Sequence, residues 1–406
     1  MTGAPSDGAL SGLRVVDLTR VLGGPFCTQW LGDLGAEVIK VEPPQGDETR
    51  AWGPPFDGKG ASSYFLGVNR SKQGIALDLR DERGREVLLR LLDGADILIE
   101  NFKIGTLEKW GLGYEETLKP RFPRLVHCRI TGFGPDGPLG RFPGYDAVVQ
   151  AMSGWMSVNG TTESGPTRLG IPMVDIGTGI TAAFGIMSAI YERERSGEGQ
   201  FLEVSLYDTA VSLLFPHASN WFLGGKRPAP VGNAHPNVSP YDTFATRTCD
   251  IFIGVGNDGQ FSRLCKALGK PELAQEPRFS GTGERNVNKV ELKQELEALL
   301  ADQDGETFCE TLMQNGVPAG PVLGVPEVVE HPQTLHRDMV VEMDGYKGLG
   351  NPIKLARTPP HPAKRPPRFG EDTRTVLARL GYAQDEIETL VGSGIAQDGS
   401  VKTAAE

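Results

Sequence analysis

The segment 170–179 (GIPMVDIGTG) contains one acidic residue, Asp175, at a position where a carboxylate could do chemistry. The apolar run 171–174 predicts a short strand, and the helical spacing of the apolar residues that follow predicts a helix over 175–195. A carboxylate at a helix N-terminus is stabilised by the helix dipole, and free amides there would stabilise a developing oxyanion. An ionised and approachable Asp175 can act as a nucleophile. Spacing alone, however, favours an ordinary N-cap, because aspartate is a preferred capping residue.

Small residues surround this carboxylate and recur in a second loop. We expect Gly170, Gly177 and Gly179 to leave room for a bulky ligand beside Asp175. A loop after a later predicted strand has exposed amides that could cover a reactive thioester or an anion, although hairpin turns have the same pattern; it comprises Gly256, Asn257, Asp258, Gly259 and Gln260. The turn that contains Leu22 lies where open α/β sheets bind ligands, and it also fits plain strand-to-helix geometry.

Cationic, amide and aromatic side chains near the strand boundaries of the first third could contact a phosphate, a carboxylate or an adenine ring. They are Arg70, Lys72, Asn101, Phe102, Lys109 and Trp110. Two cations in the short loop of Arg70 and Lys72 could hold an anion, and Trp110 could stack on a base. A solvated loop for the cations and simple packing for Trp110 remain open alternatives.

The elements that must position these residues alternate between strand-like and helix-like segments. Short apolar runs rich in β-branched residues are separated by helix-length segments, a pattern that predicts a parallel sheet covered on both faces; the runs are 13–18, 37–42, 74–79, 96–102, 124–130 and 201–206. The sequence therefore predicts a doubly wound α/β large domain. Pro, Gly and Asn cluster over 224–240, as in a linker, and strand and helix signals after it predict a smaller α+β domain. We place the boundaries at 1–223 for the first part of the large domain, 224–330 for the linker and small domain, and 331–406 for the C-terminal segment.

Composition excludes several classes of function. With a net charge of −11, the chain of 406 residues is unsuited to nucleic acid or an anionic membrane surface without a local basic patch. Five scattered cysteines without a CxxC pair, and no visible secretory signal, predict a cytoplasmic protein with reduced thiols. The six histidines lack metal-site spacing, so we expect no metal site. The absence of GxGxxG and GxSxG disfavours a nicotinamide dehydrogenase and a serine thioesterase.

Taken together and in order, these motifs resemble the class III CoA-transferases, the family of formyl-CoA transferase, carnitine CoA-transferase and α-methylacyl-CoA racemase. The likeness runs from about residue 10 to about residue 370 and rests on RVLGGPF, VNRSK, DILIENF, RITGFGPDGP, PGYDAVVQAMSG, VDIGTG, SGEGQFLEVSLYD and GVPAGPV. It implies an interlocked homodimer in which the C-terminal segment returns to the large domain.

The resemblance also implies a reaction and its residues. Asp175 would attack the thioester of a donor acyl-CoA to form a mixed anhydride and then an enzyme-bound CoA thioester, which the loop 256–260 would shield. The six residues named above would contact CoA, and Tyr145 and Asp146 would support the acyl group. Coenzyme A thioester is then a substrate, a carboxylic acid is the second substrate, and no cofactor is permanently bound.

Several positions narrow the choice within the family. A racemase of this fold would need a histidine where Tyr145 stands and a glutamate where Asn257 stands, because a two-base proton exchange requires a base on each face. Leu22 replaces the glutamine of formyl-CoA transferase, which disfavours formyl or oxalate specificity. The motifs look most like succinyl-CoA-dependent dicarboxylate transferases, with Arg168 or Arg70 as the cation for the distal carboxylate. An isomerase, intramolecular mesaconyl-CoA transfer and a catalytically silent CoA-binding scaffold are the alternatives.

Overall fold

The computed structural model describes residues 8–399, which form two compact units. Unit 1 combines 1–155, 169–216 and 333–406, and unit 2 combines 156–168 and 217–332. The boundary that the sequence predicted after residue 223 lies after residue 216. In addition, the short segment 156–168 belongs to unit 2. The C-terminal segment belongs to unit 1.

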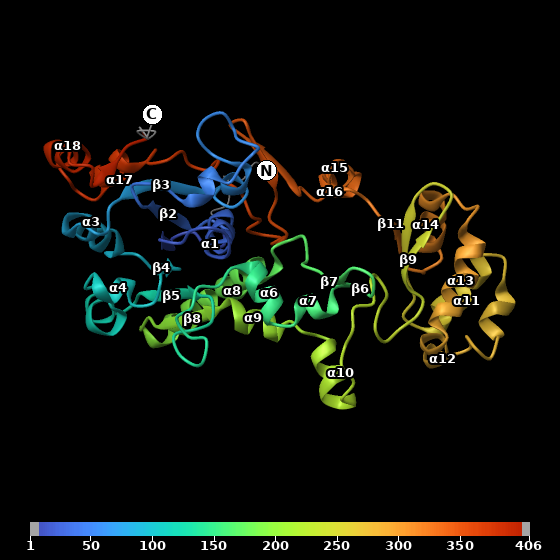
Figure 1. The fold of residues 1–406 in the computed structure, drawn as a ribbon. Helices are drawn as coiled ribbons and strands as arrows, with labels where there is room; N and C mark the ends of the chain where they lie inside the picture. Colours follow the sequence, from blue (N-terminus) through green and yellow to red (C-terminus); the bar gives the residue numbers. More distant parts are fainter. Residues whose placement is uncertain (1–7, 400–406) are drawn as a thin grey trace. The chain divides into compact units, whose positions relative to one another are not determined.

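Unit 1 is built on a seven-stranded sheet in the order β14-β3-β2-β1-β4-β5-β8 (Figure 1). Its strands are β1 (Arg14–Asp17), β2 (Glu37–Glu42), β3 (Lys72–Leu77), β4 (Ile97–Glu100), β5 (Val126–Thr131), β8 (Phe201–Ser205) and β14 (Ala396–Gln397). All neighbours pair in parallel except β14, which pairs antiparallel with β3. The predicted parallel sheet and its six strands are confirmed.

Alternate residues of the strands face two separate cores, which shows that both faces of the sheet are covered. Val16 and Leu98 pack into one core with helices α3, α17 and α18, whereas Val15 and Ile97 pack into the other with α1 and α8. Figure 1 shows α3 and α4 on one side of the sheet and α1 and α8 on the other. The helices of unit 1 are α1 (Gly23–Asp33), η1 (Glu48–Ala51), α2 (Ser63–Leu66), α3 (Glu82–Leu92), α4 (Thr106–Lys109), η2 (Tyr114–Leu118), α5 (Lys119–Arg121), α6 (Asp146–Met152), α8 (Met173–Ser196), α9 (Leu206–Ser212), α17 (Thr373–Arg379) and α18 (Gln384–Gly392).

Helix α8 differs from the prediction at its start. Residues 171–174 form no strand. The helix begins at Met173, so that Asp175 lies within its first turn instead of capping it. The apolar run was mistaken for a strand because Val174 is fully buried, but it is buried as a helical residue packed in the core with α1. By length and composition α8 could cross a membrane; nine of its residues are nevertheless buried, including Arg193, which pairs with Asp96 at 2.8 Å.

The C-terminal segment of unit 1 adds a hairpin of β12 (Val340–Met343) and β13 (Tyr346–Leu349) and then returns to the edge of the sheet. Beside β3, the carboxylate of Asp372 accepts a hydrogen bond from the Gly74 amide at 2.8 Å, and the Thr373 hydroxyl accepts one from Ala76 at 3.1 Å. These contacts and β14 cover an edge that would otherwise expose unpaired backbone groups.

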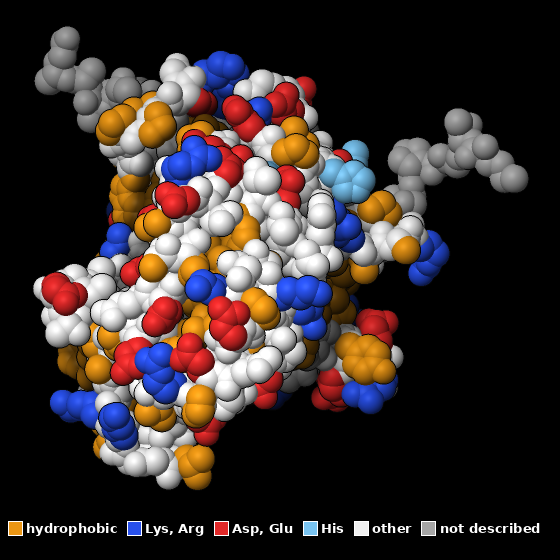
Figure 2. All heavy atoms as spheres, turned by 90° about the vertical axis from the view of Figure 1, so that its right-hand side faces the viewer, with side chains coloured by type: hydrophobic (Ala, Val, Ile, Leu, Met, Phe, Trp, Pro, Cys, Tyr) orange, Lys and Arg blue, Asp and Glu red, His pale blue; other side chains and the backbone are white. Residues whose placement is uncertain are grey.

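Unit 2 has its own core between an antiparallel sheet in the order β11-β10-β9 and a group of helices. The chain crosses between the units in α7 (Trp155–Val158) and α16 (Pro332–His336). The other elements are β6 (Gly160–Thr161), β7 (Gly165–Pro166), α10 (His217–Gly224), β9 (Tyr241–Ala245), β10 (Asp250–Gly254), α11 (Asp258–Ala267), η3 (Pro271–Gln275), α12 (Thr282–Val287), α13 (Lys289–Leu300), α14 (Gly305–Gln314), β11 (Ala319–Pro321) and α15 (Val325–Glu330). On the face drawn in Figure 2, acidic and basic side chains are interspersed.

Candidate active site

Buried charges fix the turn that follows β1. The carboxylate of Asp17 accepts hydrogen bonds from the Thr19 amide at 2.9 Å and from the Thr28 hydroxyl at 2.6 Å, and it pairs with Lys72 at 3.1 Å. From β2, the Lys40 ammonium donates to the Thr19 carbonyl at 2.8 Å. These buried contacts of Asp17 and Lys40 fix the conformation of the turn, and the residues that follow the turn begin α1.

The same contacts correct the predicted roles of Arg70 and Lys72. The ammonium of Lys72 uses its three N–H groups on Asp17, the Pro25 carbonyl and Asn69, and the side chain is buried. Arg70, only 1% exposed, donates from Nε and Nη2 to Asp33 at 3.0 and 2.6 Å. Both cations are therefore internal ion-pair partners, and burial removes them from the residues expected to bind CoA or a distal carboxylate.

The loop after β4 is joined to the turn after β1 by Asn101. Its side-chain oxygen accepts from the Arg20 amide at 3.0 Å, and its nitrogen donates to the Arg20 carbonyl at 2.8 Å. Glu100, at the end of β4, accepts from the Phe102 amide at 2.7 Å and from Arg129 Nε at 2.6 Å. Because β1 and β4 flank the point where the strand order reverses, this junction lies where doubly wound sheets place their ligands.

Asp146 supplies the cap that Asp175 had been expected to provide. One oxygen of its buried carboxylate accepts from the amides of Val174 and Asp175, at 2.8 and 3.3 Å, and the other accepts from Gln150 at 2.6 Å. Gln150 in turn accepts from the Leu169 amide at 2.9 Å, which fixes the segment before α8. These two α8 amides are occupied, so they are not the free oxyanion donors that the sequence had suggested.

The environment of Asp175 changes its acidity. Burial, and after it the charge of Asp146, raises the pKa of Asp175 to about 7. A desolvated carboxylate beside a second carboxylate holds its proton more tightly, because the charged form is disfavoured by both effects. Above neutral pH the side chain is a carboxylate of unusually high basicity, which is the property a carboxylate nucleophile needs.

Glycines near Asp175 serve helix packing. A Cβ on Gly179 would lie 2.5 Å from the Gly23 carbonyl oxygen, and one on Gly23 would lie 3.0 Å from the Asp175 carbonyl oxygen. The backbones of α1 and α8 therefore touch directly beside Asp175. Gly177 faces the side chains of Leu213 and Thr209. The expected space for a ligand beside these two α8 glycines is thus filled by the protein itself.

A cavity of about 320 Å³ in unit 1 contains Asp175 together with the residues at the carboxyl ends of β1, β4 and β5. Four other residues predicted for the site line it as well: Leu22, Asn101, Phe102 and Tyr145. Its charged lining also includes Lys103, which belongs to the motif Asn101-Phe102-Lys103 after the predicted strand, and Arg20, Arg141 and Glu48, which the sequence had not singled out. For Arg141 the available signal was position, because it stands just before the PGYD motif.

A second cavity, of about 180 Å³, adjoins the first and shares Arg20 and Phe102 with it. It is lined by apolar side chains such as Leu18 and Leu79, and by Trp110, whose ring meets that of Phe102 edge-on at 5.5 Å. Its lining also includes the charged side chains of Glu42, Asp78 and Arg80, and its apolar part beside Arg20 suits a heterocyclic base linked to an anion. Lys109 lines neither cavity.

The remaining predicted residues lie in unit 2. In the loop 256–260, the Asn257 side chain accepts from the Gln260 amide at 2.9 Å and so caps α11, while the Gln260 side chain accepts from the Gly256 amide at 2.8 Å. Asp258 pairs with buried Arg285 at 2.7 Å. Arg168 also belongs to unit 2. The shielding role of this loop and the carboxylate-binding role of Arg168 stay predictions.

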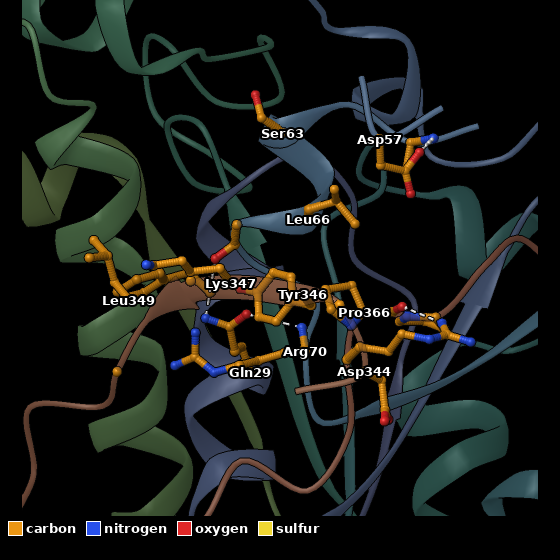
Figure 3. Close-up of a pocket in the computed structure, with 18 of the residues that line it drawn as sticks. Gln29, Asp57, Ser63, Leu66, Arg70, Asp344, Tyr346, Lys347, Leu349 and Pro366 are labelled. Carbon is orange, nitrogen blue, oxygen red and sulfur yellow. Dashed lines mark hydrogen bonds between the residues drawn. The ribbon is translucent and has the colours of Figure 1, made fainter. Parts of the chain in front are cut away.

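A larger cavity of about 550 Å³ lies elsewhere in unit 1, between α1, α2 and the β12–β13 hairpin (Figure 3). Three of its four guanidinium groups already have carboxylate partners, since Arg50 pairs with Glu42, Arg70 with Asp33 and Arg365 with Glu371, whereas Arg368 belongs to none of the ion pairs found over residues 8–399. It contains Arg70 but none of the other residues predicted for catalysis or binding. Size alone therefore does not identify the active site, which we assign to the cavity of Asp175.

An α/β sheet with a desolvated carboxylate and free cations at its carboxyl edge defines the class of a group-transfer enzyme acting on anionic substrates. The chain belongs to CoA-transferase family III, whose model matches residues 10–373. It is a CoA-transferase. It is 42% identical over 385 residues to a succinate–glutarate CoA-transferase of Agrobacterium fabrum, covering 91% of this chain and 95% of that protein.

Two further comparisons agree with this family. An acetyl-CoA:oxalate CoA-transferase of Acetobacter aceti is 41% identical over 373 residues, covering 91% of this chain and 95% of that protein. The crystal structure of a CaiB/BaiF family protein from Brucella suis matches with a TM-score of 0.83 and 40% identity, covering 92% of this chain and 100% of that one. The predicted family and enzyme class are confirmed.

Proposed function

We propose that this CoA-transferase moves CoA from an acyl-CoA to a dicarboxylic acid, with Asp175 as the covalent nucleophile. The observation that carries the proposal is a carboxylate with a pKa raised to about 7, placed in a cavity with three cations. Relatives named for glutarate, oxalate and mesaconate support a dicarboxylate as one substrate. The adjoining cavity at Phe102 and Trp110 suits the adenine of CoA, with Arg20 near its phosphates.

In the proposed reaction Asp175 passes through three covalent states: a mixed anhydride with the donor acid, a thioester with CoA and a mixed anhydride with the acceptor acid. Its carboxylate attacks the thioester carbonyl of the donor and the C–S bond breaks. CoA leaves as the thiolate, and the donor acyl group remains on Asp175 as a mixed anhydride. The thiolate then attacks the aspartyl carbonyl, which releases the donor acid and leaves CoA bonded to Asp175 as a thioester. The acceptor carboxylate attacks this aspartyl carbonyl, and the CoA thiolate finally attacks the acceptor's acyl carbonyl, which frees Asp175. No external proton donor or oxidant is needed.

The N-terminus of α1 offers donors for the oxyanions of these steps. No side chain caps this helix, and the amides of Gly23 and Gly24 make no hydrogen bond within residues 8–399. Both glycines line the cavity with Asp175. Amides that are already oriented and meet a charge developing in the transition state are an effective form of stabilisation. We therefore assign them the role that the occupied amides of α8 cannot fill.

An isomerase reaction fits this site less well. A proton exchange at Cα needs two bases. Glu48 lines the same cavity, and the carboxylate whose charge acts directly on Asp175 is that of Asp146. Both of its oxygens are engaged, by Gln150 on one side and by the amides of Val174 and Asp175 on the other. It supports α8 and is not placed as a free base.

We also propose that the enzyme is a homodimer. The solvent side of α8 is a stripe of large apolar side chains at helical spacing, with Ile180, Phe184 and Tyr191 exposed by 42%, 76% and 70%. A contiguous apolar helix face on a folded protein is typical of an interface. A second copy of the chain, as the family resemblance implies, is the partner we assign to it.

Trapping the covalent intermediate tests the proposed function. The enzyme is incubated with acyl-CoA, treated with borohydride or hydroxylamine, digested and examined by mass spectrometry. We expect a reduced or hydroxamate derivative at Asp175, and none in the Asp175→Asn variant. Glu48, the other carboxylate of the cavity, is the internal control. A derivative at Glu48, or turnover without any derivative, would contradict the mechanism.

A further inference from the structure

Three cations of the Asp175 cavity have no carboxylate partner among residues 8–399. Most arginines of the site region form ion pairs, as Arg129 does with Glu100 at 2.6 Å. Arg20, Lys103 and Arg141 belong to none of the ion pairs found over residues 8–399, although all three line the cavity. Unpaired cations gathered around a reactive carboxylate indicate a ligand with more than one anionic group.

The two cavities single out Arg20, and position in the chain separates Lys103 from Arg141, both of which line only the Asp175 cavity. Arg20 lines both the Asp175 cavity and the adjoining apolar one, and its Nε is buried without a hydrogen-bond partner. Lys103 follows Phe102, which also lines both. These two cations therefore lie toward the end of the cavity that leads to the proposed adenine pocket, where the phosphates of CoA would lie.

Arg141 lines only the cavity of Asp175, beside the wall that Phe142 and Tyr145 contribute. Its segment is folded back onto the end of β5, where a Cβ on Gly132 would lie 2.5 Å from the Gly144 nitrogen. This places Arg141 away from the shared CoA end and close to the residues expected to support the acyl group.

The backbone and one side-chain nitrogen of Arg141 are fixed. Its amide donates to the Gly134 carbonyl at 3.0 Å, and its Nε donates to the Pro135 carbonyl at 3.3 Å. Its φ is +68°, a left-handed conformation that is unfavourable for a non-glycine residue and persists only where the surroundings hold it. The two Nη groups make no hydrogen bond in the described chain. The two Nη groups are therefore available to donate two parallel hydrogen bonds to the two oxygens of a carboxylate.

We propose that Arg141 binds the second carboxylate of the dicarboxylic substrate and thereby selects dicarboxylic over monocarboxylic acids. This inference rests on the proposed function and names the residue that the sequence had sought in Arg70 and Arg168. With the reacting carboxylate at Asp175, the far carboxylate meets the guanidinium fork at the opposite end from CoA. A monocarboxylic acid of equal length places a methyl group there and leaves the arginine unpaired.

The test compares two acceptors that differ only at the far end, glutarate and valerate. The acyl-CoA donor is the one the wild-type enzyme uses best and is held constant. For Arg141→Gln we expect kcat/KM for glutarate to fall about 100-fold, as the loss of one charge-assisted pair implies, whereas valerate loses no more than a few-fold. Arg141→Lys, which keeps a charge but not the fork, should give an intermediate glutarate-to-valerate ratio and covers the case in which the glutamine variant does not fold.

Two control variants separate the alternatives. Lys103→Gln should lower transfer to both acceptors equally, because it acts at the CoA end. Arg121→Gln removes an exposed arginine outside both cavities and should leave the ratio as it is. An equal loss for both acceptors in the Arg141 variants would assign Arg141 to CoA and overturn the proposal, as would an unchanged ratio. If the wild-type enzyme transfers CoA to neither acid, it is the proposed function that fails.

Discussion

Asp175 is a residue whose chemical usefulness should reduce the stability of the fold. Its folded-state pKa of about 7 lies above the ordinary value of 3.8, so the folded protein binds more protons than the unfolded chain between these pH values. The associated stability is present below pH ~4 and is lost as pH rises through about 7. At pH 8 the folded enzyme must hold a charge that burial and Asp146 both oppose.

We therefore predict that Asp175→Asn stabilises the protein at pH 8 by roughly 1–3 kcal/mol while abolishing transfer. At pH 4 the gain should largely disappear, because Asp175 is then neutral in the folded protein and the unfolded chain is close to its own pKa of 3.8. Urea denaturation of both proteins at the two pH values measures the difference. Asp93→Asn, at an exposed carboxylate without an ion pair, is the control and should show no such pH-dependent gain. A gain of equal size at both pH values would argue against a buried charge at Asp175.

At this scale the sequence identified the reactive residue but not its partners. The motif indicated Asp175, whereas Asp146, which caps the helix and raises the pKa of Asp175, lies 29 positions away, and Gln150 contacts Asp146 and not Asp175 itself. The loop of Arg70 and Lys72 looked like a solvated anion site because charge is visible in a sequence and burial is not. Arg141 escaped notice because an isolated arginine has no pattern.

At the scale of elements, the contact between α1 and α8 aligns the proposed oxyanion donors with the nucleophile. The contact has no room for a side chain, since a Cβ on Gly179 would lie 2.5 Å from a backbone oxygen of α1. Backbone cannot move aside as a flexible side chain can. The distance between the Gly23 and Gly24 amides and Asp175 therefore depends on a glycine at this position.

We predict that Gly179→Ala destabilises the protein by about 1–3 kcal/mol, as overpacking does, and lowers kcat more than KM. The matched control is Gly177→Ala on the same helix. There a Cβ would meet only side chains, Leu213 at 3.3 Å and Thr209 at 3.5 Å, and alanine favours the helix by roughly 0.5–1 kcal/mol. Thermal unfolding and steady-state kinetics of both variants check this. Equal effects of the two substitutions would mean that the close backbone contact has no special role.

Six strands of the large sheet could be predicted because each is a short apolar run, fully or mostly buried in five of them and half-buried in β8. The strand predicted for the run before Asp175 was wrong, because four apolar residues suit either a strand or the first turn of a helix. Val174 packs beside α1 in the core on that face of the sheet, and this packing decided the outcome. A sequence window of four residues does not contain the neighbour that settles its conformation.

At the scale of the whole molecule, the exposed stripe on α8 predicts self-association. Phe184→Asp should convert a dimer into monomers or weaken it at least ~10-fold, because a charge would be desolvated in an apolar contact. Sedimentation velocity over a range of concentrations measures this. Val287→Asp, at an 82% exposed residue of α12 in unit 2, is the control for adding a charge to an exposed apolar position. A wild-type monomer at micromolar concentration would refute the interface.

The division of the chain into units was only partly visible in the sequence. The Pro- and Gly-rich stretch 224–240 predicted the start of the second unit, but the chain passes from unit 1 to unit 2 after residue 216. The segment 156–168 joins unit 2 although it lies between α6 and α8, and no change of composition marks it. Whether such a short segment packs with one unit or the other depends on its tertiary contacts, and not on the secondary-structure preference of its own residues.

The return of the C-terminal segment to β3 has a consequence for biosynthesis. All residues that line the proposed catalytic cavity lie between positions 20 and 206, so they leave the ribosome early. The strand that closes the edge of their sheet, β14, lies at 396–397 and is made after all of them and after unit 2. During translation β3 therefore has an open edge until β14 is made, and the nascent enzyme is exposed to strand-pairing with other chains during that time.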